Sequence, residues 1–391
     1  MNAFFAELSQ LYSGGDRVRV LDRLIEILRD SGNYHQLFDA SLLQKKLSMG
    51  ISPSDPSGFD DVPEGKRAEF EEYYIETARK VGQMLLDAGN ISAGWVYFRT
   101  IREPGPVVKA IEAYQPDPDG SPSDEIIELA LYQGLAPAKG VELMLSYHGT
   151  CPTITALDQG FRQLTPEQRR ACAGVMVKRL YRDLRNSVGL DLERRSGNLP
   201  PETSTLAEIV EQHPELFEND NYHIDVSHLN AVVRFARSLA PNDVELDEAR
   251  QLTAYGRKLA PQYQYSAEPP FDQFYPASYH YFSVLLDDHR EESLGYFRDR
   301  LAAEPGEQEP ESTRQLIALA LVELLSKIGG ESEAAEIGVK YLAGVQDQIG
   351  ISLGELCLKA NRPELLAELA RSREDLVAFT LALLRTPATS V

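Results

Sequence analysis

Residues 81–106, VGQMLLDAGNISAGWVYFRTIREPGP, carry the pattern that decides the fold. Apolar side chains recur at helical spacing in the first half, at Val81, Met84, Leu85 and Leu86. They recur again in the second half, at Trp95, Val96, Phe98 and Ile101. The residues between the halves, DAGN at 87–90, are typical of a tight turn, and EPGP at 103–106 stops the second half. The pattern predicts a helical hairpin, which is a structural unit and not a chemical one.

The spacing of small and aromatic residues in this hairpin resembles the tetratricopeptide repeat. Repeats of that family carry a small residue in each helix, an aromatic residue late in the second helix and a proline beyond it. These positions fall on Gly82, Gly94, Phe98 and Pro106. In such a repeat the small residues let the helices approach closely, the aromatic ring fills the groove between them, and the proline ends the second helix. The opening tryptophan of the family is missing, because Ala78 stands in its place.

A second, degenerate copy of the pattern follows in residues 129–152. It keeps the second small residue, an apolar residue after it and the proline, at Gly140, Met144 and Pro152. The turn sequence LRDSGN at 28–33 also repeats LLDAGN at 85–90. The resemblance implies an all-α protein, a right-handed α-solenoid of helical hairpins with little or no β-sheet. It further implies an interaction scaffold, and it carries over no catalytic residue.

Loop-forming composition suggests how the chain is organised. Residues 196–205, SGNLPPETST, form the clearest linker, so we expect helical repeats in 1–200, including both hairpins, and again in 201–391. Residues 261–276, PQYQYSAEPPFDQFYP, combine prolines with many aromatic side chains. An aromatic loop of this kind either fills the core or faces a ligand, and the sequence leaves both alternatives open.

The charge of the chain limits its partners. The 391 residues carry a formal net charge of -21, which disfavours nucleic acid and anionic membranes, since both need a basic surface. Acidity mainly promotes solubility, and it also attracts basic partners. The three cysteines are far apart, as in proteins of reducing compartments. Neither a secretory signal nor an apolar stretch of spanning length is present, so we expect a cytoplasmic protein.

Residues 66–86 are expected to form the long first helix of the central hairpin. In stacked hairpins the first helices line a concave surface that holds a peptide or a partner helix. The residues predicted to face such a partner are Glu69, Glu72, Tyr73 and Glu76. The acids suit a basic or amphipathic segment, and Tyr73 could provide an aromatic anchor. The alternative is that this is the solvated face of a long helix.

Short catalytic motifs are absent: the sequence has no P-loop, no GxGxxG after a strand, no HExxH and no GxSxG, and no cofactor is expected. The one cluster that could bind zinc or iron is His223, Asp225 and His228. The two histidines do not share helical spacing, which favours helix capping by Asp225 or Ser227 instead. A non-catalytic protein–protein interaction scaffold is therefore the favoured function. The alternative is a metal-dependent enzyme on a helical scaffold that uses this cluster.

Overall fold

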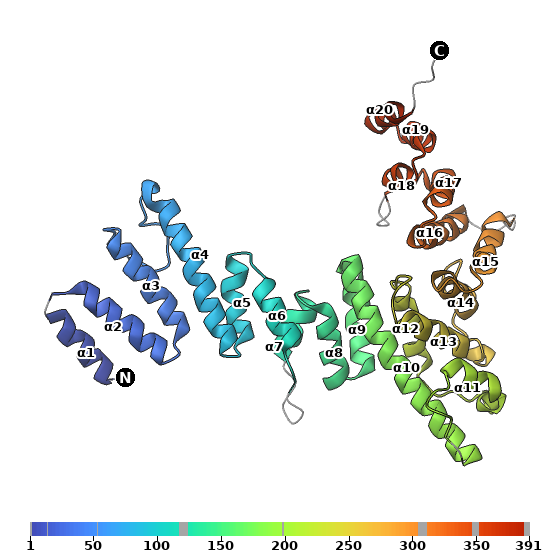
Figure 1. Cartoon of the computed structure of the whole chain (residues 1–391), viewed down its shortest axis with the longest axis horizontal. Helices are drawn as coiled ribbons and strands as arrows, with labels where there is room; N and C mark the ends of the chain where they lie inside the picture. The colour runs from blue at the N-terminus through green and yellow to red at the C-terminus, as the bar shows by residue number, and fades with distance from the viewer. Residues whose placement is uncertain are drawn as a thin grey trace. The chain divides into compact units, whose positions relative to one another are not determined.

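In the computed structural model shown in Figure 1, all regular secondary structure of the described residues is helical, and these residues contain no β-strand. The all-α fold class predicted from the sequence is therefore confirmed. The chain forms two compact units, Met1–Gly149 and Thr150–Val391, called here the N-terminal and C-terminal units. The structure describes residues 2–13, 15–52, 54–116, 124–197, 199–303, 311–345 and 352–386.

Helices that follow one another in the sequence pack together in the N-terminal unit. The core between α3 and α4 is built from aromatic and aliphatic side chains, including the buried Phe38, Phe70 and Tyr97. The helices of this unit are α1 (Asn2–Ser13), α2 (Arg17–Asp30), α3 (Tyr34–Ser48), α4 (Glu64–Asp87), α5 (Ile91–Thr100), α6 (Gly105–Ala113), α7 (Asp124–Ile127), the π-helix η1 (Glu128–Tyr132) and α8 (Pro137–Tyr147).

The C-terminal unit continues the same sequential packing from α13 to α20. Its long helix α10 also packs against α12 and α13. The α-helices of this unit are α9 (Thr150–Gly160), α10 (Pro166–Ser196), α11 (Leu206–Gln212), α12 (Val226–Ala236), α13 (Leu246–Gly256), α14 (Phe274–Leu285), α15 (Arg290–Ala302), α16 (Glu311–Lys327), α17 (Glu331–Leu342), α18 (Leu353–Lys359), α19 (Pro363–Ser372) and α20 (Leu376–Arg385). Three short 3₁₀-helices are η2 (Phe161–Gln163), η3 (Pro214–Asp220) and η4 (Pro261–Tyr263).

One type of turn joins many of these helices. After α2 and after α4 a glycine takes positive φ, at Gly32 (68°) and Gly89 (78°). The next residue donates its backbone N–H back to the last turn, from Asn33 to the Leu28 carbonyl and from Asn90 to the Leu85 carbonyl, both at 2.9 Å. Each asparagine then caps the following helix. This is the Schellman arrangement, so the repeated turn sequence corresponds to a repeated backbone geometry.

The linker expected near residue 200 lies inside the C-terminal unit, and the compact units divide earlier, at Gly149–Thr150. The Arg185 guanidinium of α10 donates to the carbonyl oxygens of Pro201, Glu202 and Ser204 at 2.7–3.2 Å. Because α10 also packs against α12 and α13, the elements on both sides of the linker share one core.

The aromatic segment 261–276 contributes three rings to the core of the C-terminal unit. Phe271, Phe274 and Tyr275 are buried, while Tyr265 stays exposed with its ring edge-on to Phe274, 4.9 Å between centroids. The sequence left open whether this loop fills the core or faces a ligand. The three buried rings fill the core.

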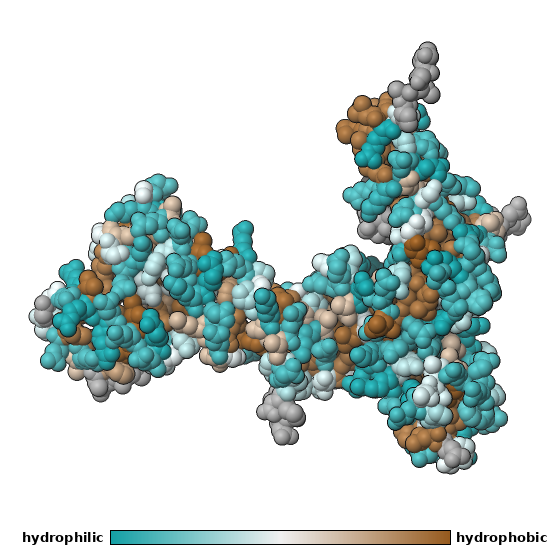
Figure 2. All heavy atoms as spheres, viewed as in Figure 1, coloured by the Kyte–Doolittle hydropathy of each residue, from teal (hydrophilic) through white to brown (hydrophobic). Residues whose placement is uncertain are grey.

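The surface is mostly hydrophilic in the view of Figure 2, with apolar side chains gathered over α20. Leu376, Val377 and Leu384 on that helix are 79–80% exposed. Helix α20 therefore presents to water a surface that proteins normally bury. In the described part of the chain, no helix combines the length and apolar character needed to cross a membrane.

Candidate functional site

The closest approach of α4 and α5 occurs at the residues that the repeat pattern singled out. A Cβ atom at Gly82 would lie 2.8 Å from Cε2 of Phe98, whose ring is fully buried. A Cβ atom at Gly94 would lie 2.8 Å from Cδ2 of Leu86 and 3.2 Å from the Gly82 carbonyl oxygen. A side chain at position 82 would collide with the buried Phe98 ring, and a side chain at position 94 would force Leu86 to move, so glycine at both positions allows the two helices to pack this closely.

The two prolines of the pattern act differently from the expectation. Helix α5 ends at Thr100, before the proline, in a turn where Arg102 takes a φ of 58°. Pro106 lies in the first turn of α6 and Pro152 in the first turn of α9. A first-turn proline is favourable because its missing N–H would have no partner within the helix in any case. The prolines therefore begin the next helix and do not end the second one.

The degenerate second copy packs in a related way. A Cβ atom at Gly140 of α8 would lie 2.7 Å from Cβ of Leu131, which belongs to the π-helix η1. Met144 on the same helix is buried, with 6% of its surface exposed. Glycine at position 140 thus allows α8 to pack closely against η1. The residue that it contacts is Leu131, whereas Gly82 in the central hairpin contacts the aromatic ring of Phe98.

Two further contacts of this kind were not found from the sequence. A Cβ atom at Gly256 of α13 would overlap the ring of Tyr275 in α14. A Cβ atom at Gly338 of α17 would lie 2.6 Å from Cδ2 of Leu353 in α18. The long connection between α13 and α14 obscures the spacing that made the central hairpin recognisable. A pattern of a helical glycine followed by an aromatic residue at any spacing would have predicted the contact between Gly256 and Tyr275.

The residues predicted to meet a partner lie along α4, and we call them the α4 acidic face: Glu69, Glu72, Tyr73 and Glu76. Glu69 pairs with Lys45 of α3 at 2.6 Å and Glu76 pairs with Lys80 at 2.7 Å. Each carboxylate accepts a hydrogen bond from a lysine ammonium, and this bond lowers the pKa of both Glu69 and Glu76. Glu72 is exposed and makes no ion pair with any described residue.

Tyr73 is less available as an anchor than the sequence suggested. Its side chain is half-buried and packs against the core between α3 and α4. The Lys45 ammonium lies 5.4 Å from the centre of its ring. The exposed parts of this face are therefore the three carboxylates and Lys80, while Lys45 is half-buried.

Two residues of the proposed metal cluster, Asp225 and His223, have other partners. Asp225 caps α12, because its Oδ1 accepts hydrogen bonds from the Ser227 backbone N–H at 2.8 Å and the Ser227 hydroxyl at 2.6 Å. His223 instead contacts Asp191 through Nε2 at 3.1 Å and the Tyr255 hydroxyl through Nδ1 at 3.0 Å. Burial lowers the pKa of His223, and the Asp191 carboxylate opposes that shift.

No group of three or more His, Cys, Asp or Glu side chains is placed to hold a metal ion in the described part of the chain. The structure joins His223 to Asp191, a residue far away in the sequence. His228 is half-buried further along α12. The cluster seen in the sequence therefore reflects neighbouring positions in the chain and not a common binding site.

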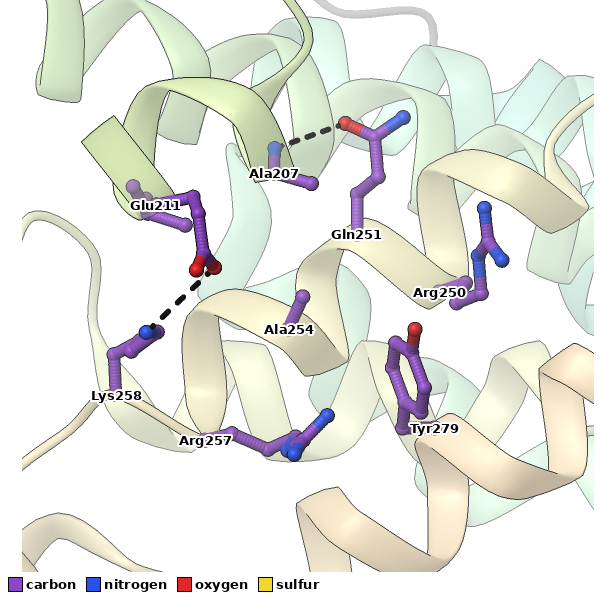
Figure 3. A pocket seen from close by; sticks show the side chains of 9 residues that line it. Ala207, Glu211, Arg250, Gln251, Ala254, Arg257, Lys258 and Tyr279 are labelled. Carbon is purple, nitrogen blue, oxygen red and sulfur yellow. Dashed lines mark hydrogen bonds and ion pairs between the residues drawn. The ribbon is translucent and has the colours of Figure 1, made fainter. Parts of the chain in front are cut away.

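A pocket that the sequence did not suggest lies in the C-terminal unit, between α11, the end of α13 and α14 (Figure 3). Its volume is about 480 Å³. The polar and aromatic side chains in its lining are Glu211, Arg250, Gln251, Arg257, Lys258 and Tyr279. Three cations thus line one pocket of an otherwise acidic chain.

Comparisons with protein-family models, with curated proteins and with solved structures found no match. The resemblance to the tetratricopeptide repeat therefore rests on the residues of the hairpins and on the contacts they make. Function has to be argued from the surfaces of this chain, because a helical fold by itself does not specify one.

Proposed function

We propose that the protein is a non-catalytic interaction scaffold of tetratricopeptide type, a right-handed solenoid of helical hairpins that binds a partner protein or peptide. The observation that carries this proposal is the packing of α4 on α5, in which Gly82 and Gly94 admit Phe98 and Leu86. The recurring Schellman turns support it, because they give successive hairpins the same local geometry.

The partner is a basic or amphipathic segment that binds the α4 acidic face. Glu72 offers a carboxylate without a protein cation, and the pairs of Glu69 and Glu76 lie at the surface. An exposed pair such as that of Glu76 and Lys80 contributes about 0–1 kcal/mol, so a partner's lysine or arginine can replace Lys80 at low cost. The net charge of -21 draws such a segment toward the chain before contact.

The cytoplasm is the compartment that we propose. Cys151, Cys172 and Cys357 are all free thiols. Burial raises the pKa of Cys172 to about 12 and that of Cys357 to about 11, so both remain protonated and unreactive. Buried, unpaired thiols are usual in reducing compartments.

Affinity capture from the native host, followed by mass spectrometry, should identify the partner, whose binding is then measured with purified components. We expect binding that weakens as salt rises and weakens again in a Glu72→Lys, Glu76→Lys double variant. Glu71→Lys is the control, because Glu71 is exposed on the same helix and points away from the face, about 100° around the helix axis from Glu72. A partner that is indifferent to salt and to the double variant would remove this face as the binding site.

A further inference from the structure

The pocket of the C-terminal unit has one side that is already fixed by internal bonds. The Gln251 side chain accepts hydrogen bonds from the Tyr181 hydroxyl at 3.0 Å and the Ala207 backbone N–H at 3.3 Å. Its amide donates to Asp247 at 2.7 Å. Arg250 pairs with the same aspartate at 2.8 Å and also with Asp288. These groups are satisfied, so they hold the wall in place and leave ligand binding to other side chains.

The other side carries two cations whose donors are open. The Arg257 guanidinium is exposed and lies 4.8 Å from the centre of the Tyr279 ring, and it has no carboxylate partner among the described residues. The Lys258 ammonium lies 3.8 Å from the Glu211 carboxylate, which is too far for a hydrogen bond. Figure 3 shows Lys258 and Glu211 on one side of Ala254, Tyr279 on the other side, and the Arg257 side chain below Ala254.

We propose that this pocket binds a small phosphate monoester. Guanidinium and ammonium groups are the usual protein donors to phosphate oxygens, and Arg257 and Lys258 provide one of each. Ala254 leaves space between them, and the Tyr279 ring offers an apolar wall for the organic part of the ligand. The volume of about 480 Å³ falls within the range of small-molecule sites. The pocket belongs to the C-terminal unit, so this proposal does not depend on the α4 acidic face.

Calorimetric titration of the full chain with phenyl phosphate and with inorganic phosphate tests the site. We expect saturable binding of one phenyl phosphate, tighter than that of inorganic phosphate. Arg257→Gln and Lys258→Gln should each weaken it by roughly tenfold or more, as loss of a charge-assisted hydrogen bond does. Glu211→Gln should strengthen it, because this change removes the carboxylate that competes for Lys258.

Arg182→Gln is the matched control. Arg182 is 65% exposed on α10, outside the pocket, and its nearest described carboxylate is Asp183 at 3.9 Å. This variant should bind phenyl phosphate like the parent protein, and circular dichroism should show all variants folded. Titrations use chloride at matched ionic strength, since a chain of charge -21 gains stability from any salt.

Four results would overturn the proposal. The first is the absence of saturable binding of phenyl phosphate. The second is equal affinity for phenyl phosphate in the Arg257→Gln and Arg182→Gln variants. The third is that chloride competes with phenyl phosphate as strongly as inorganic phosphate does. Equal affinity for inorganic and phenyl phosphate would reject a monoester ligand, because the Tyr279 wall would then contribute nothing.

Discussion

The contact between Gly82 and Phe98 predicts a change of sign in a double-mutant cycle. A methyl group at position 82 would lie 2.8 Å from the Phe98 ring, which is fully buried and has no room to withdraw. Overpacking of this kind costs about 1–3 kcal/mol, while alanine in place of glycine inside a helix gains about 1 kcal/mol. We expect Gly82→Ala to lower the free energy of unfolding of the N-terminal unit by on the order of 1 kcal/mol.

Removing the ring should reverse the effect. Phe98→Ala alone creates a cavity and should cost about 3–5 kcal/mol. In that background the methyl group at position 82 meets no ring and keeps its helical advantage. Gly82→Ala should then stabilise by up to about 1 kcal/mol, which corresponds to a coupling energy of about 2 kcal/mol between the two positions.

Urea unfolding followed by tryptophan fluorescence measures this cycle directly. Trp95 is the only tryptophan of the chain, and its indole N–H donates to the Gln133 side chain at 2.8 Å within the N-terminal unit. Gly65→Ala is the control. Gly65 lies on the same helix α4, and a Cβ atom there would meet no heavy atom within 4 Å. The packing argument is refuted if Gly82→Ala has the same sign and size with and without the Phe98 ring.

Three other changes have defined outcomes. Gly256→Ala should destabilise the C-terminal unit in thermal unfolding, and more strongly than Gly82→Ala destabilises its own unit, because the added methyl overlaps the buried Tyr275 ring. Burial keeps the pKa of His223 below 6.5, so the unfolded chain takes up that proton first as pH falls. The melting temperature of the C-terminal unit should therefore fall from about pH 7 to about pH 5, and a pH series on His223→Gln should show a flatter dependence. Lys46 is fully buried and donates to three oxygens of the loop between α3 and α4. Lys46→Met should expose that loop to limited proteolysis. Lys45→Met next to it should not, because it removes the contacts of Lys45 with Glu69 and the Tyr73 ring but no bond to the loop.

The central hairpin was predictable because its determinants are local. Glycine at the turn, asparagine at the cap and the spacing from Gly82 to Phe98 all lie within one short stretch, and each has a direct physical meaning. The same turn also occurs after α5 and after α19 without glycine, where Arg102 and Glu374 take positive φ. Those residue types do not favour this conformation, so only the packing of the helices on either side explains them.

The candidate sites were predictable only in part. Helical periodicity placed Glu69 and Glu72 on the exposed side of α4, but the partner of Glu69 is Lys45 on another helix, which periodicity does not reveal. The proposed phosphate pocket combines residues of α11, α13 and α14 with Arg257 and Lys258, which follow α13, and in the sequence none of them belongs to a recognisable motif. The metal cluster was suggested by residues that are close in the sequence. In the structure they have different partners, because His223 contacts Asp191.

The central claim is that the α4 acidic face binds the partner, and carboxyl footprinting of the chain with and without the captured partner tests it most directly. A water-soluble carbodiimide labels exposed carboxylates, and mass spectrometry reads each site separately. We predict that partner binding reduces labelling of Glu72 and Glu76, while labelling of Glu71, which is exposed about 100° around the α4 axis from Glu72, stays unchanged. Unchanged labelling of Glu72 and Glu76 beside a protected Glu71, or protection confined to the C-terminal unit, would contradict the claim.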